Sequence, residues 1–164
     1  MSVRRERQKG NAAVEAALVF LPLILTVFST MEVTRGMWMY HTLTSAIKSG
    51  ARYTALHGQN CVEAATSCAV TVGDISSVIK KSGVGLDADH LQLTLTANGS
   101  THSCATLATC LSDQTAWPPA NHNAPGLSVT IEGSYSFQSV VSILWPGQVS
   151  SFTYLGKATE IIQF

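Results

Sequence analysis

The feature that most constrains this chain is a run of twenty residues, Ala12 to Met31, that holds a single charged side chain, Glu15. A helix of this length rises roughly 30 Å, which is the thickness of the hydrocarbon core of a bilayer. Pro22 lies inside the run and lacks a backbone donor, so we expect the helix to bend or loosen near it. The sequence therefore predicts a transmembrane helix over about residues 12–31, with a kink at Pro22.

The distribution of charge predicts the orientation of this helix. Residues 1–10 carry four basic side chains and one acidic one, a net of +3, whereas residues 53–164 carry three basic and seven acidic ones, a net of −4. Basic residues gather on the cytoplasmic side of membrane spans. Residues 1–10 are therefore predicted to be a cytoplasmic leader, and the chain after Met31 is predicted to lie outside. The basic side chains of the leader are Arg4, Arg5, Arg7 and Lys9.

A secretory signal peptide, removed after the apolar run, is the alternative interpretation. Its apolar region would be longer than the usual 7–15 residues, and no A-x-A-like cleavage site follows Met31. Both features favour an anchor that stays on the protein.

Composition excludes several other classes of protein. The 164 residues have no formal net charge, and charged residues make up 12%, about half the usual ~25%. This excludes a disordered chain, a basic nucleic-acid-binding protein and a highly charged coiled coil. The sequence contains neither G-x-S-x-G nor H-E-x-x-H, and it has no Gly-rich loop between a strand and a helix. We therefore expect no catalytic residues, no cofactor, no resident metal and no nucleic-acid partner.

An amphipathic pattern continues beyond the predicted span. Apolar residues recur at steps of three or four, as on one face of a helix. His57 and Gly58 suit the end of a helix. We therefore expect one continuous helix over residues 11–57, with an apolar stripe on its outer half that must pack on another element. The stripe consists of Val33, Met37, Tyr40, Leu43, Ile47, Ala51 and Ala55.

Residues 58–164 are predicted to form an exterior α+β domain. A short helix is expected after Asp74, which can cap it, and Gly83 marks its end. Three segments of alternating apolar and polar residues predict strands, with a possible bulge at Gly156 in the last of them. Such alternation is typical of an antiparallel sheet with one dry face. The predicted fold is thus a long N-terminal helix packed on a small antiparallel sheet, with one additional short helix. The strands are expected near residues 91–96, 127–137 and 151–164.

A loop of nearly thirty residues is expected between the first two strands, starting at the Asn98-Gly99 turn signal. The sequence Asn98-Gly99-Ser100 is also a glycosylation sequon, although a turn is the simpler interpretation.

All four cysteines lie in the predicted exterior domain, at Cys61, Cys68, Cys104 and Cys110. An even number of cysteines in an oxidising compartment predicts two disulfides. Short-range pairs, Cys61 with Cys68 and Cys104 with Cys110, would staple two loops, but three connectivities remain open. A metal site is the alternative for the second pair. It would use His102, Cys104, Cys110 and His122, whose spacing lacks the tight C-x2–4-C clip of structural zinc sites.

Two short motifs resemble those of a known family. The stretch from Arg7 to Leu18 resembles a class III (prepilin-type) signal, in which a basic leader ends in Gly and a Glu stands at the fifth position after the cut. Here these residues are Gly10 and Glu15. Residues 46–53, Ala-Ile-Lys-Ser-Gly-Ala-Arg-Tyr, resemble the A-x-x-x-G-A-R-Y segment of TadE-like proteins. Together the motifs resemble a TadE-like minor pseudopilin of the Tad (Flp) pilus, a type IV-like system, over about residues 7–57.

The resemblance implies a role in pilus assembly. A prepilin peptidase would cut after Gly10, leave Asn11 as the new N-terminus and keep the apolar helix on the mature protein. Glu15 could then pair with the new ammonium on its own chain or on a neighbour. Many type IV prepilins have Phe or Met directly after the cut, whereas this chain has Asn11.

The partners implied by the resemblance are other pilins or pseudopilins and the pilus assembly platform. The expected location is the bacterial inner membrane, with the domain of residues 58–164 periplasmic or extracellular. The alternative is an uncleaved single-span protein whose exterior domain binds a ligand or an envelope partner.

Overall fold

The computed structural model describes residues 3–60, 68, 70–140 and 151–163, with side chains described from residue 12 onward. The chain divides into two compact units, Met1–Met37 and Trp38–Phe164. Helix α1 (Val3–Leu56) forms the described part of the first unit, and its last nineteen residues belong to the second. Pro22 lies within α1. The bend expected there stays a prediction.

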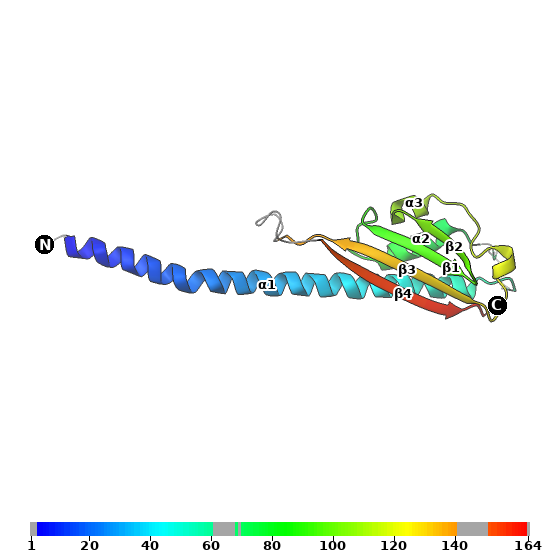
Figure 1. Cartoon of the computed structure of the whole chain (residues 1–164), viewed down its shortest axis with the longest axis horizontal. Coiled ribbons are helices and arrows are strands. Elements are labelled where there is room, and N and C mark those ends of the chain that lie inside the picture. Colours follow the sequence, from blue (N-terminus) through cyan, green and yellow to red (C-terminus); the bar gives the residue numbers. More distant parts are fainter. Residues whose placement is uncertain (1–2, 61–67, 69, 141–150, 164) are drawn as a thin grey trace. The chain divides into compact units, whose positions relative to one another are not determined.

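The second unit contains a four-stranded antiparallel sheet in the order β2-β1-β3-β4 (Figure 1). Its strands are β1 (Leu91–Ala97), β2 (Ser100–Cys104), β3 (Ser128–Phe137) and β4 (Phe152–Ile161). The β1–β2 hairpin turns at Asn98 and Gly99, whose φ angles are 43° and 88°. Asn and Gly tolerate these left-handed angles better than other residues, which is why Asn-Gly favours tight hairpins. The predicted α+β class is confirmed.

Strand alternation gives the sheet one dry face, which α1 and α2 (Val72–Ser82) cover. Leu43 and Ile47 of α1 lie against the backbone of β3 and β4, and Ile79 of α2 lies against Gly50 of α1. All three side chains are fully buried. They belong to one core that also contains Ala46, Ala51, Val72, Ile75, Leu91, Leu93, Leu95, Val129, Ile131, Tyr135 and Ile162.

The start of α2 differs from the expectation. Thr71, not Asp74, is the N-cap residue, and Asp74 stands at the third helical position. The Thr71 hydroxyl accepts a hydrogen bond from the Asp74 backbone N–H at 3.2 Å, and the Asp74 carboxylate accepts one from the Thr71 backbone N–H at 2.9 Å. This reciprocal capping box satisfies two donors that the first turn would otherwise leave unpaired. The expected end of this helix is confirmed, because Gly83 is its C-cap.

Three expectations about the exterior domain are wrong in detail. The expected loop after Asn98 contains strand β2, helix α3 (Leu107–Leu111) and the 3-10 helix η1 (Ala120–His122), so there is more than one additional short helix. Strand β2 was missed because its residues, Ser-Thr-His-Ser-Cys, carry almost no apolar alternation. No bulge occurs at Gly156, since β3 and β4 pair residue by residue from Ser128–Ile161 to Phe137–Phe152.

The apolar stripe of α1 is confirmed only in its second half. Leu43, Ile47, Ala51 and Ala55 are buried, whereas Val33, Met37 and Tyr40 are exposed.

Candidate functional site

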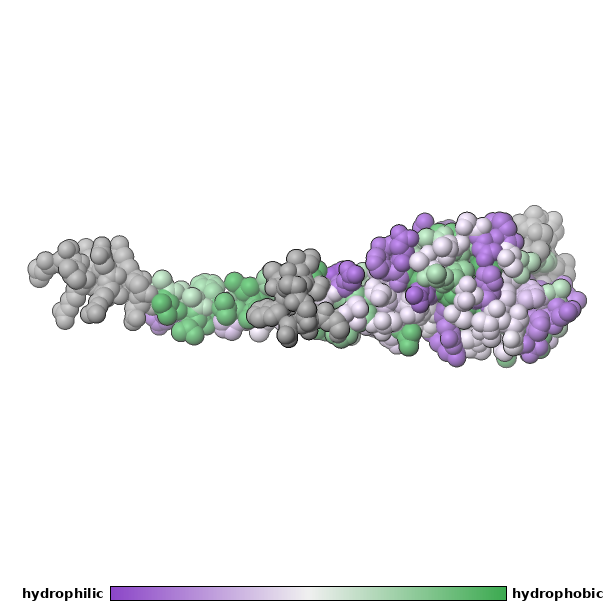
Figure 2. All heavy atoms as spheres, turned by 45° about the horizontal axis from the view of Figure 1, so that its top comes forward, coloured by the Kyte–Doolittle hydropathy of each residue, from purple (hydrophilic) through white to green (hydrophobic). Residues whose placement is uncertain are grey.

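The first unit presents a helical segment whose large apolar side chains are all exposed (Figure 2). They occur on every side of the helix, so the segment has no polar face that would suit water. Among the described residues, α1 is the one helix long and apolar enough to cross a membrane. Its exposed apolar residues up to Met31 are Val14, Leu18, Val19, Phe20, Leu21, Leu23, Ile24, Leu25, Val27, Phe28 and Met31.

The hydroxyl side chains in this segment are satisfied within the helix itself. Thr26 donates to the Leu23 carbonyl at 2.7 Å, and Ser29 donates to the Leu25 carbonyl at 2.8 Å. Thr30 donates in the same way to the carbonyl of residue 27 at 2.9 Å. Hydrocarbon offers no partner for a hydroxyl, so this internal bonding is what a membrane segment needs.

The predicted processing and assembly residues lie at the N-terminal end of this helix. The backbones of Gly10 and Asn11 belong to α1. The side chains of Arg4, Arg5, Arg7 and Lys9 lie outside the described ones, as does that of Asn11.

The Glu15 side chain is described, and it is exposed on the single chain. An exposed carboxylate in an otherwise apolar segment is free to meet a group on another chain. The cut, the leader and the pairing of Glu15 stay predictions.

The second unit contains a disulfide between Cys104, at the end of β2, and Cys110 in helix α3. Cys110 is fully buried beside Leu107, so the bond ties a short helix to the edge of the sheet. Cys68 is also disulfide-bonded. Cys61, its predicted partner, lies outside the described residues.

The metal site that the sequence spacing of His102, Cys104, Cys110 and His122 suggested is not formed. The Cys104 sulfur is bonded to Cys110, and His122 donates from Nδ1 to the Asn98 carbonyl at 3.1 Å. The ligand atoms of His102 and Cys104 do lie within 4.8 Å of a group that the sequence did not indicate, the carboxylate of Asp113. With the sulfur in a disulfide, two ligands remain. Two ligands fall short of a structural metal site.

His102 and Asp113 instead form a hydrogen-bonded pair. His102 Nε2 donates to Asp113 Oδ2 at 2.8 Å, and both side chains are partly buried. Hydrogen bonds from the Thr115 side chain and backbone lower the pKa of Asp113, with a smaller contribution from His102. The Asp113 carbonyl also accepts from the Gly73 backbone N–H at 2.8 Å. Asp113 thus connects β2 to the start of α2, a structural role that explains the pair.

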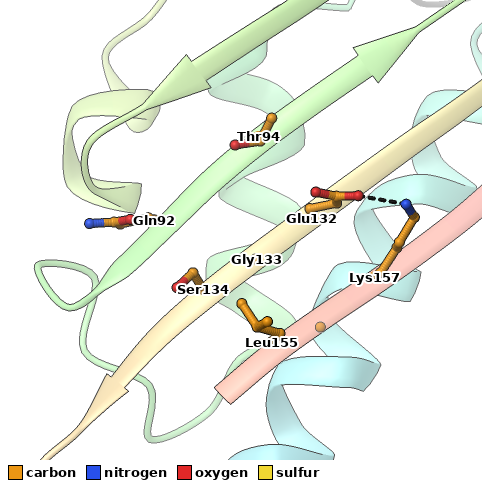
Figure 3. A pocket seen from close by; sticks show the side chains of 8 residues that line it. Gln92, Thr94, Glu132, Gly133, Ser134, Leu155 and Lys157 are labelled. Atoms are coloured by element: carbon orange, nitrogen blue, oxygen red, sulfur yellow. Dashed lines mark ion pairs between the residues drawn. The ribbon is translucent and has the colours of Figure 1, made fainter. Parts of the chain in front are cut away.

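The outer face of the sheet carries a shallow hollow of about 250 Å³ (Figure 3). Its rim includes the ion pair between Glu132 Oε1 and Lys157 Nζ, which are 2.7 Å apart across β3 and β4. Gln92, Thr94 and Ser134 complete a neutral, hydrogen-bonding wall. The rim thus carries one charge of each sign and no net charge.

Neither the His102–Asp113 pair nor the hollow can be read from the sequence, for the same reason. Each is made by residues from separate elements, such as β2 and the turn after α3, whose contact depends on the sheet order. The sequence indicated His102 as a possible metal ligand, but nothing in it pointed to Asp113 as the partner of His102.

The fold and this helix define a class: a protein whose described residues form one candidate membrane span and a small α+β domain. Comparison with protein families narrows the class. The family model for TadE-like protein matches residues 10–52, and the chain is TadE-like over this segment. The match starts at Gly10 and ends at Arg52, so it includes Glu15, Pro22 and most of the second motif. No curated protein and no solved structure matches the chain.

Proposed function

We propose that this protein is a minor pseudopilin that takes part in the assembly of a Tad-type pilus. The observation that carries the proposal is the coincidence of two features in one segment. The TadE-like match covers residues 10–52, and the same segment contains the apolar helix whose side chains have no cover. A helix of this kind needs either lipid or other helices around it, and a pilus subunit meets both in turn.

In the proposed pathway the helix first anchors the precursor in the inner membrane. The basic leader of residues 1–10 stays in the cytoplasm, and the domain after Gly58 is outside. A prepilin peptidase then cuts the bond between Gly10 and Asn11. The cut removes the leader with its net charge of +3, so the mature chain becomes acidic overall.

The cut also creates a charged group that can pair with the Glu15 carboxylate. A carboxylate in a membrane span costs about 2.5–3.5 kcal/mol at the helix centre, and less near an edge, unless it has a partner. The new ammonium of Asn11 is such a partner, one turn of helix away on the same chain or on a neighbouring subunit. In this proposal the pair guides the docking of one helix against the next.

The proposal is tested by the mass of the N-terminus in protein purified from its own host. We expect the mature chain to begin at Asn11. Gly10→Asp should leave a longer, uncut chain in the membrane, because prepilin peptidases require the small residue before the cut. Gln8→Asp is the matched control, since it adds the same charge two residues earlier, and it should still be cut.

An intact N-terminus at Met1 or Ser2 in the parent protein would contradict the proposal. It would favour the alternative of an uncleaved single-span protein with an exterior binding domain.

A further inference from the structure

One end of the second unit carries a group of aromatic side chains, which we call the aromatic collar (Trp38, Tyr40, Phe152 and Tyr154). The ring centroids of Tyr40 and Tyr154 are 6.2 Å apart, so α1 meets β4 here. Phe137 of β3 lies beside the two collar residues of β4, since its ring is 5.6 Å from that of Tyr154 and its backbone pairs with Phe152. The collar therefore lies where β3 ends and β4 begins.

Three of the four collar rings are exposed, unlike the other described aromatic rings of this unit. Trp38 is 61% exposed, Phe152 54% and Tyr40 45%. Among the described Phe, Trp and Tyr residues from Trp38 onward, these three are the only ones in the exposed class. Exposed large rings cost free energy in water, so their concentration at one end indicates a surface that is covered in the functioning protein.

The two segments that carry the collar contain no charged residue. Residues 36–47 of α1 contain no Asp, Glu, Lys or Arg. Neither does the whole stretch 133–156, which includes the end of β3 and the start of β4. The charged side chains of β3 and β4, such as Glu132 and Lys157, begin immediately outside that stretch. The nearby charged side chains, such as Asp87 and Asp89 before β1, lie outside these two segments, so the collar itself offers no ion pair to a partner.

The position of Trp38 in the chain identifies the covering surface. It lies seven residues after Met31 in the same helix, which corresponds to a rise of roughly 10 Å. Helical side chains lean toward the N-terminus, so the indole reaches back toward the apolar segment. The headgroup layer extends roughly 5–8 Å beyond the hydrocarbon core on each side. Trp and Tyr concentrate at this level because each has an apolar ring and a polar tip.

We propose that the aromatic collar binds the outer headgroup layer of the phospholipid bilayer and seats the exterior domain on the membrane surface before assembly. The inference rests on the proposed span over residues 12–31. Because the collar has no cationic residue, its contact with lipid should not depend on anionic headgroups. A seated domain would hold the subunit upright, with its helix available to neighbouring helices.

The test uses tryptophan emission from the full chain, one copy per phosphatidylcholine nanodisc, with Trp145→Phe as the background. Lipids brominated near the headgroup or near the chain ends quench rings at the corresponding depth. We expect Trp38 emission to fall more with shallow bromines than with deep ones. Trp38→Phe should abolish this quenching, because the remaining Trp117 is buried in the domain core.

Two further variants, in the background Trp38→Phe with Trp145→Phe, sharpen the test. Phe152→Trp should be quenched by shallow bromines. Ile161→Trp is the matched control, since it is 60% exposed at the other end of the same strand, about 30 Å away, and it should not be quenched. Replacing part of the phosphatidylcholine by phosphatidylglycerol should leave the result unchanged.

A reporter inside the span separates the failure of this inference from the failure of the proposed anchoring. Phe20→Trp in the same background should be quenched by deep bromines. If Phe20→Trp is quenched but neither Trp38 nor Phe152→Trp is, the collar does not touch lipid and the inference is overturned. If Phe20→Trp is not quenched either, the predicted span itself is wrong.

Discussion

Gly133 of β3 stands directly opposite Gly156 of β4, and helix α1 lies on this pair of glycines. A Cβ atom built on Gly133 would lie 2.6 Å from Ile47 Cδ1, and one on Gly156 would lie 3.2 Å from Leu43 Cγ. Neither glycine has a positive φ, so close approach, rather than backbone conformation, explains both. The absence of two side chains lets the helix approach the sheet closely at this point.

Gly133→Val is therefore expected to destabilise the exterior domain. The added side chain must push Ile47, which is fully buried, away from the sheet. Overpacking of this kind typically costs about 1–3 kcal/mol. We expect urea unfolding of the detergent-solubilised chain, followed through Trp117 fluorescence in the background Trp38→Phe with Trp145→Phe, to show a lower midpoint. Ser134→Ala, on the outer face of the same strand, is the control and should change the free energy of unfolding by less than about 0.5 kcal/mol.

Thr71→Ala is expected to weaken α2 by removing its N-cap. The substitution deletes the hydroxyl that accepts from the Asp74 backbone N–H. Loss of such a cap typically costs about 1 kcal/mol, with a range of 0.5–2. Thr71→Ser keeps the hydroxyl and should retain most of the stability. Equal losses in both variants would show that the methyl group of Thr71, and not its hydroxyl, matters.

The same capping box predicts a dependence of stability on pH. Hydrogen bonds from the backbone and side chain of Thr71 lower the pKa of Asp74 below its ordinary value of 3.8. A carboxyl whose pKa is lowered by folding stabilises the fold at pH values above the unfolded pKa. This stabilisation is lost as the pH falls through the folded pKa. The stability difference between the parent and Asp74→Asn should thus be largest above about pH 5 and should shrink below the ordinary value.

A difference that stayed constant down to pH 2 would contradict this account of Asp74. Thr71→Ala provides an internal check, since removing the partner should flatten the acid dependence as well.

The disulfide between Cys104 and Cys110 is expected to stabilise the domain. It closes a short loop, with a sequence separation of six residues, for which chain entropy gives about 2 kcal/mol. The double variant Cys104→Ala with Cys110→Ala should unfold at a correspondingly lower urea concentration. Thiol alkylation of the denatured, non-reduced parent should label none of its four cysteines. Two or more labelled cysteines, or stoichiometric zinc, would overturn the prediction of two disulfides.

The elements that the sequence predicted well are those with a clear period. Strand β3 alternates strictly between apolar and polar residues, and α1 carries long apolar runs, so both could be placed from the sequence. The stripe on α1 was predicted to begin at Val33, yet burial begins only near Leu43. Periodicity identifies which face of a helix is apolar. It does not tell whether that face packs against the same chain, against lipid or against another chain.

The elements that the sequence did not predict depend on contacts between distant residues. Strand β2 is held by its pairing with β1, such as Thr94 opposite Ser103, and not by its own composition. Gly156 suggested a bulge because glycine in a strand often marks one. Its actual role depends on Leu43, more than a hundred residues earlier in the chain. The His102–Asp113 pair depends in the same way on where the turn after α3 lies.

Glu15→Gln tests whether the carboxylate near the start of the apolar segment serves assembly. If Glu15 only reaches toward the lipid headgroups, the change should be neutral or slightly favourable, because it removes a costly charge from the span. If it pairs with the ammonium of Asn11 on a neighbouring subunit, the change leaves that ammonium unpaired in a low-dielectric bundle. Loss of one partner of a buried pair costs about 3–5 kcal/mol, which is on the order of a hundredfold to a few thousandfold in association.

We therefore expect Glu15→Gln to be inserted in the membrane and cut after Gly10, yet to be lost from the assembled pilus. Crosslinking between chains across residues 11–20 should fall with it, while Trp117 fluorescence reports an unchanged exterior domain. Glu15→Asp keeps the charge on a shorter side chain and should retain part of the crosslinking. If Glu15→Gln assembles as well as the parent, the carboxylate has no pairing role, and its place near the membrane edge is explained by contact with headgroups alone.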